Sequence, residues 1–231
     1  MRPFELELRQ GVAELALVLE DAQINQLLDY LELIQKWTKV YNLTAVRDPA
    51  EMLTHHLLDS LAIIGPLRIQ WARLMAQART SNERSQMAAD SVLRLLDVGS
   101  GAGLPGVVIA ICCPDIEVDC VDTVAKKAAF IRQVAATLRL PNLKGLHARV
   151  ESLTDKYSIV SSRAFASLLD FTNWSEEALA EQGVWLAMKG KHPTDEIAAL
   201  PTSVAVLHVE QLQVPGLLAE RCIVWMQKPL R

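Results

Sequence analysis

The segment that decides the fold runs from Leu95 to Gly106 and reads LLDVGSGAGLPG. Its apolar start, Leu95 to Val98, passes directly into glycines at positions 99, 101, 103 and 106. Glycines let the backbone adopt left-handed conformations and let a ligand approach the main chain closely. An apolar strand, a glycine-rich turn and a following helix open a βαβ unit. The segment therefore predicts an α/β sheet with a ligand site at the end of its first strand.

The chain after Ser91 continues this pattern, because short apolar runs alternate with helical segments as far as LKGLHARV, which ends at Val150. Such alternation predicts a parallel sheet flanked by helices. Four later apolar runs, YSIVSSRA, GVWLAMKG, SVAVLHVEQLQV and RCIVWMQK, raise the expected number of strands to about seven. The last two flank Pro215-Gly216 and predict a hairpin at one sheet edge. We therefore expect residues 91–231 to form one Rossmann-like α/β domain.

The first 90 residues have a helical pattern. Residues 12–40 predict a pair of amphipathic helices, with one apolar stripe formed by Leu27, Leu28, Leu31, Ile34 and Trp37. Asp48-Pro49-Ala50-Glu51 predicts a helix start, and Gly65-Pro66 predicts the end of that helix. The polar stretch 76–90 is interpreted as a helix tail followed by a linker. We therefore place a boundary near Ser91, after a helical N-terminal region of residues 1–90.

Composition limits the classes of protein that fit. With 231 residues and 51% apolar side chains, the chain has enough apolar surface for a core, which excludes extensive disorder. Its start lacks the apolar segment of a signal peptide, and no long uncharged stretch predicts a membrane span. The four cysteines form neither a disulfide pattern nor a zinc pattern. These features predict a soluble cytoplasmic protein.

Charge is unevenly distributed along the chain. The formal net charge of -4 by itself counts against a nucleic-acid partner. However, residues 1–32 contain two basic and seven acidic residues, whereas residues 122–163 contain eight basic and three acidic ones. The basic middle of the chain fits either a solvated helix face or a site for a polyanion.

Two kinds of nucleotide ligand fit the glycine segment. Gly101-x-Gly103-x-x-Gly106, with Asp122 further on, has the spacing of a dinucleotide fingerprint and favours an NAD(P)-linked oxidoreductase. In that fingerprint, however, the first glycine follows the strand directly. Here this glycine is Gly99, and Leu104 stands where the third glycine is required. The acidic Asp97 two residues before Gly99 is instead usual in methyltransferases that use S-adenosylmethionine (SAM).

Polar residues gather where the predicted strands end. Asp122 ends the second strand, His147 to Glu151 follow the third, and Ser161 to Arg163 end the fourth. Ligands of such sheets lie over the carboxyl ends of the strands, so these side chains are expected to share one crevice. Asp122 is placed to accept both ribose hydroxyls of a nucleoside. The alternative is that Asp122 only caps the next helix.

Several stretches in order along the chain resemble one family, the GidB/RsmG type of small-subunit ribosomal RNA guanine-N7 methyltransferases. They are Tyr41 to Thr44, Arg47 to Pro49, His56 to Ser60, Asp97 to Gly106, Arg149 to Glu151, Ser162 to Ser167 and Leu212 to Pro215. The resemblance implies a class I SAM-dependent methyltransferase fold. It further implies that SAM is bound by Gly99, Leu104, Val150 with Glu151, and Arg163, to which the glycine loop and the second strand add Gly101 and Asp122.

The implied chemistry needs few catalytic groups. The lone pair of guanine N7 is free at neutral pH, so methyl transfer requires in-line placement and desolvation but no proton removal. We predict that Arg149 and Arg163 are the catalytic residues, holding the base and its phosphates, with Lys189 and Lys191 at further phosphates. Neither an Asp/Asn-Pro-Pro-aromatic loop nor a cysteine nucleophile is expected, and Cys112 and Cys113 are interpreted as packing groups.

Other features favour structural roles. His55, His56 and Asp59 have helical spacing but no further strong ligand nearby, so no metal site is expected. His56 is expected to pack against the glycine loop or to line an RNA entrance. The five tryptophans are expected in the core. The expected partner is small-subunit rRNA or the assembled subunit, without a membrane, and the protein is expected to be a monomer. A non-catalytic RNA-binding or ribosome-binding module with the same fold is the remaining alternative.

Overall fold

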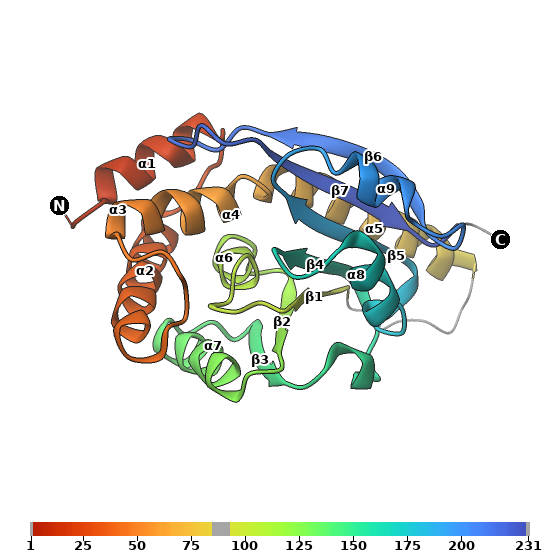
Figure 1. The fold of residues 1–231 in the computed structure, drawn as a ribbon, viewed down its shortest axis with the longest axis horizontal. Coiled ribbons are helices and arrows are strands. Elements are labelled where there is room, and N and C mark those ends of the chain that lie inside the picture. The colour runs from red at the N-terminus through yellow and green to blue at the C-terminus, as the bar shows by residue number, and fades with distance from the viewer. Residues whose placement is uncertain (1, 85–92, 230–231) are drawn as a thin grey trace.

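The computed structural model describes residues 2–84 and 93–229, which form one seven-stranded mixed sheet with its helices (Figure 1). The strand order is β3-β2-β1-β4-β5-β7-β6. The strands are β1 (Arg94–Val98), β2 (Glu117–Asp122), β3 (Leu143–His147), β4 (Tyr157–Arg163), β5 (Leu179–Lys189), β6 (Ala205–Leu212) and β7 (Arg221–Gln227). The prediction of about seven strands in an α/β fold is confirmed.

Strands β1 to β5 are parallel to one another, whereas β7 runs antiparallel to both β5 and β6. The predicted hairpin is confirmed, and β6 is the outermost strand. Because β1 to β5 are parallel, their carboxyl ends lie at the same edge of the sheet. Polar residues at these ends are therefore brought together even though they are far apart in sequence.

The helices that follow the glycine segment are α6 (Gly106–Cys112), α7 (Ala125–Thr137), the 3-10 turn η2 (Val150–Ser152), α8 (Leu168–Ser175) and α9 (Thr194–Ala198). Successive residues of β1 belong to different hydrophobic clusters. Leu95 belongs to the cluster that includes α6 and the N-terminal helices, and Leu96 to the cluster that includes α8. This alternation is the period of two expected for a strand buried on both faces.

The N-terminal region contains α1 (Glu5–Glu14), α2 (Asp21–Tyr41), α3 (Pro49–Met52), the π-helical turn η1 (Leu53–Leu58), α4 (Asp59–Leu61) and α5 (Ile64–Arg84). As predicted, Asp48 begins a helix, because its Oδ1 accepts hydrogen bonds from the N–H groups of Ala50 (2.9 Å) and Glu51 (3.0 Å). The prediction that Gly65-Pro66 ends a helix is wrong. Both residues lie in the first turn of α5, where the missing proline N–H has no helical partner to lose.

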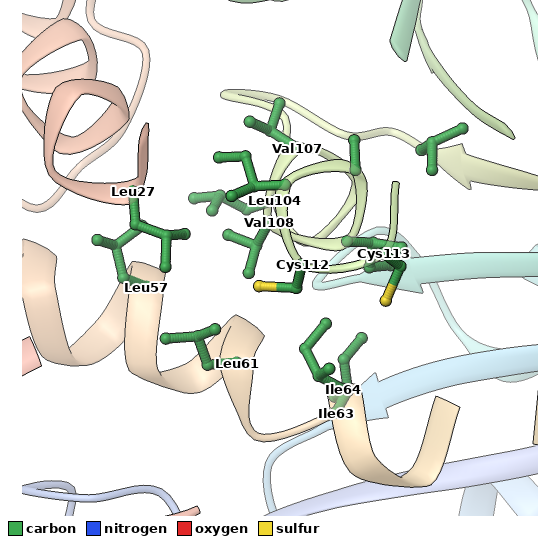
Figure 2. Packing of buried hydrophobic residues seen from close by; sticks show 14 of the residues in the cluster. Leu27, Leu57, Leu61, Ile63, Ile64, Leu104, Val107, Val108, Cys112 and Cys113 are labelled. Atoms are coloured by element: carbon green, nitrogen blue, oxygen red, sulfur yellow. The ribbon is translucent and has the colours of Figure 1, made fainter. Parts of the chain in front are cut away.

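Helix α6 connects the N-terminal region to the sheet. All seven of its residues are buried, as expected for a helix that is apolar on every side. Figure 2 shows side chains of α6 together with Leu27 of α2, Leu57 of η1 and Leu61 of α4. The N-terminal helices and the sheet therefore share one core. The predicted boundary near Ser91 lies outside the described residues, so the division into 1–90 and 91–231 stays a prediction.

Cys112 and Cys113 lie at the C-terminal end of α6, and both are buried (Figure 2). Burial raises the pKa of the Cys113 thiol to about 11. Their interpretation as packing groups is confirmed. Within the described ranges, no helix has both the length and the apolar character needed to cross a bilayer.

Candidate active site

The glycine loop joins β1 to α6 at the carboxyl end of the central strand. Gly99 and Gly101 have φ angles of 64° and 59°, in the left-handed region that glycine adopts without steric cost. The Gly99 N–H donates a hydrogen bond to the carbonyl of Val121 (2.9 Å). The ring of Phe165 packs against Gly99 so closely that a side chain at this position would collide with it. At Gly99 and Gly101 the loop therefore presents main chain to its surroundings, whereas Leu104 contributes a side chain.

Asp97 lies beneath this loop and is fully buried. One carboxylate oxygen accepts a hydrogen bond from the Gly106 N–H (3.1 Å), and the other accepts one from the Ser161 hydroxyl (3.0 Å). Burial raises the pKa of Asp97 to about 7. Asp97 thus ties the end of the glycine loop to β1 and β4, which gives a structural reason for an acidic residue at this position.

A crevice with two halves opens beside the loop at the carboxyl ends of the strands. We call the half against the N-terminal helices the helix-side cavity; it has a volume of about 430 Å³ and includes Gly101, Leu104 and Arg163. The strand-side cavity lies at the ends of β2 and β3, has a volume of about 500 Å³, and is lined by Asp122, Arg149, Val150 and Glu151, among others. Gly99 and Ala164 line both halves. The residues predicted to bind SAM or to act in catalysis therefore all line one or both halves of this crevice, whereas Lys191 lines neither.

Asp122 connects the strand-side cavity to the glycine loop. Its Oδ2 accepts a hydrogen bond from the Gly101 N–H (3.0 Å), and its Oδ1 accepts one from the Val124 N–H (2.8 Å). The N-cap residue of α7 is Val124, so Asp122 does not cap that helix directly. Each carboxylate oxygen can accept two hydrogen bonds, so Asp122 can bind ligand hydroxyls while it holds the loop.

Two exposed charged side chains, Arg149 and Glu151, line the same cavity on either side of the buried Val150. Phe165 and Trp174 form its aromatic wall, and their ring centroids lie 5.7 Å apart in an edge-to-face arrangement. The prediction that the tryptophans lie in the core is wrong for Trp174, whose exposed fraction is 42%.

The helix-side cavity contains a buried carboxylate held between two arginines. Asp59, 3% exposed, accepts hydrogen bonds from Arg163 Nη1 (2.9 Å) and from Arg221 Nε (2.8 Å). Arg163 Nη1 also donates to the carbonyl of His55 (2.8 Å) in the π-helical turn, a type of turn that is frequent at functional sites. We call Asp59, Arg163 and Arg221 the arginine clamp. It joins the N-terminal helices to β4 and β7, and neither Asp59 in this role nor Arg221 was predicted from the sequence.

His56 lines the helix-side cavity and is buried. Its Nε2 lies 2.8 Å from Thr44 Oγ1. Burial, followed by the nearby charge of Arg163, lowers the pKa of His56 to about 4, so the imidazole is neutral at pH 7. Among the described residues, no group of three His, Cys, Asp or Glu side chains could hold a metal ion. His56 therefore acts here as a neutral wall of the cavity.

Lys189 lies at the end of β5, where the sequence suggested a phosphate contact, and it lines the helix-side cavity. Its ammonium group already donates hydrogen bonds to Glu196 (2.8 Å) and to the carbonyl of Ala166 (3.0 Å). Lys191 is exposed. In this structure Lys189 therefore orders the segment after β4 and is not free for an anion.

Sequence comparison finds full-length relatives. The GidB family, described as rRNA small subunit methyltransferase G, matches residues 23–70 and 71–224. The chain is 69% identical over 228 residues to a ribosomal RNA small subunit methyltransferase G from Albidiferax ferrireducens, covering 99% of each chain. It is 66% identical over 224 residues to the protein of the same name from Acidovorax sp., covering 97% of this chain and 95% of that one.

Among solved structures, the fold is similar to that of a SAM-dependent methyltransferase from Aquifex aeolicus. The TM-score is 0.50 at 13% identity, and the match covers 78% of this chain and 97% of the other. At this identity the likeness supports the fold alone.

Proposed function

This chain belongs to the GidB family of small-subunit ribosomal RNA methyltransferases, and on that premise we propose that SAM, bound in the crevice, is its methyl donor. As a member of this family, it methylates N7 of a guanine in 16S ribosomal RNA. The observation that carries this conclusion is the match with family members over nearly the whole chain. The NAD(P)-linked oxidoreductase and the non-catalytic binding module find no support among these relatives.

The residues of the crevice fit a nucleoside with a charged amino-acid tail. Both halves have volumes in the usual range of small-molecule sites. Asp122 and Glu151 supply carboxylate acceptors for ribose hydroxyls, and Val150 and Leu104 supply apolar contacts. Gly99 and Gly101 let the ligand lie against the main chain. When bound, SAM would supply an electrophilic methyl group.

The protein's own contribution to the reaction is positioning. Guanine N7 has a free lone pair, so no residue has to remove a proton, and the neutral His56 is consistent with this. All four cysteines are buried, so none is available as a nucleophile. Arg163 and Arg149 would hold the base and its phosphates. Because Asp59 and the His55 carbonyl both bind Nη1 of Arg163, the guanidinium is fixed in one orientation before the RNA arrives.

The finer details of the partner and the location are part of the same proposal. An enzyme that acts on 16S rRNA works where ribosomes assemble, so we place it in the cytoplasm. The substrate is the rRNA itself or the assembled small subunit, and the monomeric state stays a prediction.

The direct test combines purified protein, methyl-tritiated SAM and 16S rRNA transcribed in vitro, both as naked RNA and in reconstituted small subunits. The expected result is transfer of label to one guanine, mapped by borohydride and aniline cleavage, which is specific for N7-methylated guanine. Intact SAM binding without transfer to either form of RNA would favour a binding module instead. Binding of NADH in preference to SAM in equilibrium dialysis would reject the proposed donor.

A further inference from the structure

One outer edge of the molecule has a concentration of positive charge. Residues 33–47, which end α2 and form the following loop, and residues 123–149, which form α7 and β3, contain nine of the 23 basic residues and none of the 27 acidic ones. The two segments lie side by side (Figure 1). The rings of Trp37 and Phe130 are 5.1 Å apart, and Lys126 Nζ lies 5.3 Å from the ring centre of Tyr41. We call the surface formed by these two segments the basic edge.

The cations of the basic edge are mostly unpaired. Within the described part of the chain, only two of them have a carboxylate partner: Lys127 Nζ lies 3.6 Å from Asp122, and Lys144 Nζ lies 3.8 Å from Glu117. Elsewhere the pattern is the opposite. Every lysine and arginine off the basic edge whose side chain is described forms an ion pair, except Arg73 and Lys191. Folding therefore neutralises most cations of the molecule but leaves those of this edge available.

The basic edge also contains an open groove. A shallow, open groove of about 810 Å³ lies where α7 ends and β3 begins, lined by apolar residues that include Leu140 and Leu143 and by Arg132, Arg139 and Lys144. Strand β3 is the outermost strand at this side of the sheet. The 13 residues of α7 extend over roughly 20 Å at the helical rise per residue.

The basic edge is continuous with the crevice. Helix α7 begins beside the end of β2, and Lys127 and Arg149 of the edge line the strand-side cavity. At the other segment of the edge, Leu43 and Thr44 line the helix-side cavity. The groove lies towards the other end of α7, so a polymer that follows the length of this helix would reach from the groove to the crevice.

We propose that the basic edge is the docking surface for the rRNA strand next to the methylated guanine, with phosphates bound along α7 and β3. This inference rests on the proposed function, which requires RNA at the crevice. Charge complementarity carries it, because the rest of the chain has an acidic excess that repels phosphates. The exposed ring of Tyr41, beside Lys126, adds a face on which a base can stack. An acidic protein could also bind the positive charge of the edge. The continuity of the edge with the crevice would then have no function, so we favour RNA.

The test compares two double variants with the same change of charge. Arg139→Gln with Lys144→Gln removes two cations from the groove. Arg73→Gln with Lys156→Gln is the matched control: like Arg139, Arg73 is exposed and forms no ion pair with any residue that the structure describes, and Lys156 lies 3.6 Å from Glu177 with 54% exposure, against 57% for Lys144. Affinity for transcribed 16S rRNA is measured over a range of salt concentrations, together with affinity for SAM.

The groove variant is expected to bind rRNA about tenfold more weakly, with the slope of log affinity against log salt reduced by between one and two, because each lost phosphate contact lowers that slope by about one. Its SAM affinity and its turnover at saturating rRNA are expected to match wild type. Equal rRNA affinity and salt dependence in both double variants would overturn the proposal. So would a groove variant that loses affinity for polyglutamate, a model of an acidic protein, but keeps its affinity for rRNA. Failure of the proposed function would differ, because wild type itself would then transfer no methyl group to rRNA.

Discussion

The two halves of the crevice are built in different ways. In the strand-side cavity the functional side chains lie at the strand ends: the buried Asp122 hydrogen-bonds the loop beside it, whereas Arg149 and Glu151 are exposed. In the helix-side cavity Asp59 and His56 are buried, and the arginine clamp joins three distant parts of the chain. The comparison teaches that one half relies on side chains at neighbouring strand ends, two of them exposed, whereas the other is held rigid by ion pairs between distant parts of the protein.

This difference assigns separate tasks to the two halves. Open, exposed groups can bind a ligand at little cost to folding, whereas a buried ion pair contributes through its geometry and is costly to break. Variants in the helix-side cavity should therefore change stability and turnover together. Variants of the exposed Arg149 and Glu151 in the strand-side cavity should change ligand binding with little effect on stability.

Asp59→Ala should have the largest effect, because it leaves two partly buried arginines facing each other without their carboxylate. We expect the free energy of unfolding to fall by about 3–5 kcal/mol, as when one partner of a buried ion pair is removed. Methyl transfer to rRNA should be lost even at saturating SAM. Chemical denaturation and the tritium assay measure the two effects. Asp59→Asn keeps the shape and is the control; an Asp59→Ala protein as stable as wild type would show that the clamp is not structural.

The pH dependence of stability tests the burial of His56 and has the next largest effect. Its pKa is lowered from 6.5 to about 4 in the folded protein, so its contribution to stability is present above pH 6.5 and is lost as the pH falls towards 4. This loss amounts to at most about 3 kcal/mol at 1.36 kcal/mol per pKa unit.

The measurement compares wild type with His56→Gln between pH 7 and pH 4, because the difference between them cancels other titrating groups such as Asp97. Wild type should lose stability relative to His56→Gln as the pH falls. Parallel curves would mean that His56 is accessible to protons in the folded protein.

Asp122→Ala tests the strand-side cavity. We expect SAM affinity to fall by about 1–3 kcal/mol, because ribose hydrogen bonds and the support of the Gly101 N–H are both lost. Isothermal titration calorimetry measures this change. Asp122→Asn keeps an oxygen acceptor, so its SAM affinity should lie between those of wild type and Asp122→Ala. An unchanged SAM affinity in Asp122→Ala would remove the ribose from this cavity.

Arg149→Ala should have the smallest effect of the series. The exposed Arg149 is expected to bind RNA and not SAM, so SAM affinity should stay within about twofold while turnover on rRNA falls about tenfold, as for one lost charged hydrogen bond. Calorimetry and the tritium assay are read side by side, with Arg73→Ala as the surface control. The reverse pattern, weaker SAM binding with normal turnover, would exchange the roles assigned to Arg149 and Asp122.

The sequence allowed prediction of the half of the site that depends on local structure. Asp122 ends one predicted strand and Glu151 lies shortly after the next, and parallel strands bring their ends together whatever the details of packing. The helix-side cavity could not be predicted in this way. Asp59 lies 104 residues from Arg163 and 162 residues from Arg221, and nothing in the pattern of either arginine selects this carboxylate.

The errors have similar causes. The exposed position of Trp174 depends on how α8 meets the loop after β4, which an isolated tryptophan does not reveal. Gly65-Pro66 suggests a helix end from local rules, but the actual break falls at Ala62 and Ile63, and Pro66 then fits the first turn of α5. In both cases the local sequence is compatible with two arrangements, and tertiary packing determines which one forms.

The most direct test of the central claim is a crystal structure with SAM bound. We predict that its adenosine lies in the strand-side cavity, with the ribose hydroxyls within hydrogen-bond distance of Asp122 or Glu151. The sulfonium methyl group should face the helix-side cavity, towards Arg163. A ligand bound away from Gly99, or one whose methyl group faces away from the arginine clamp, would contradict the account.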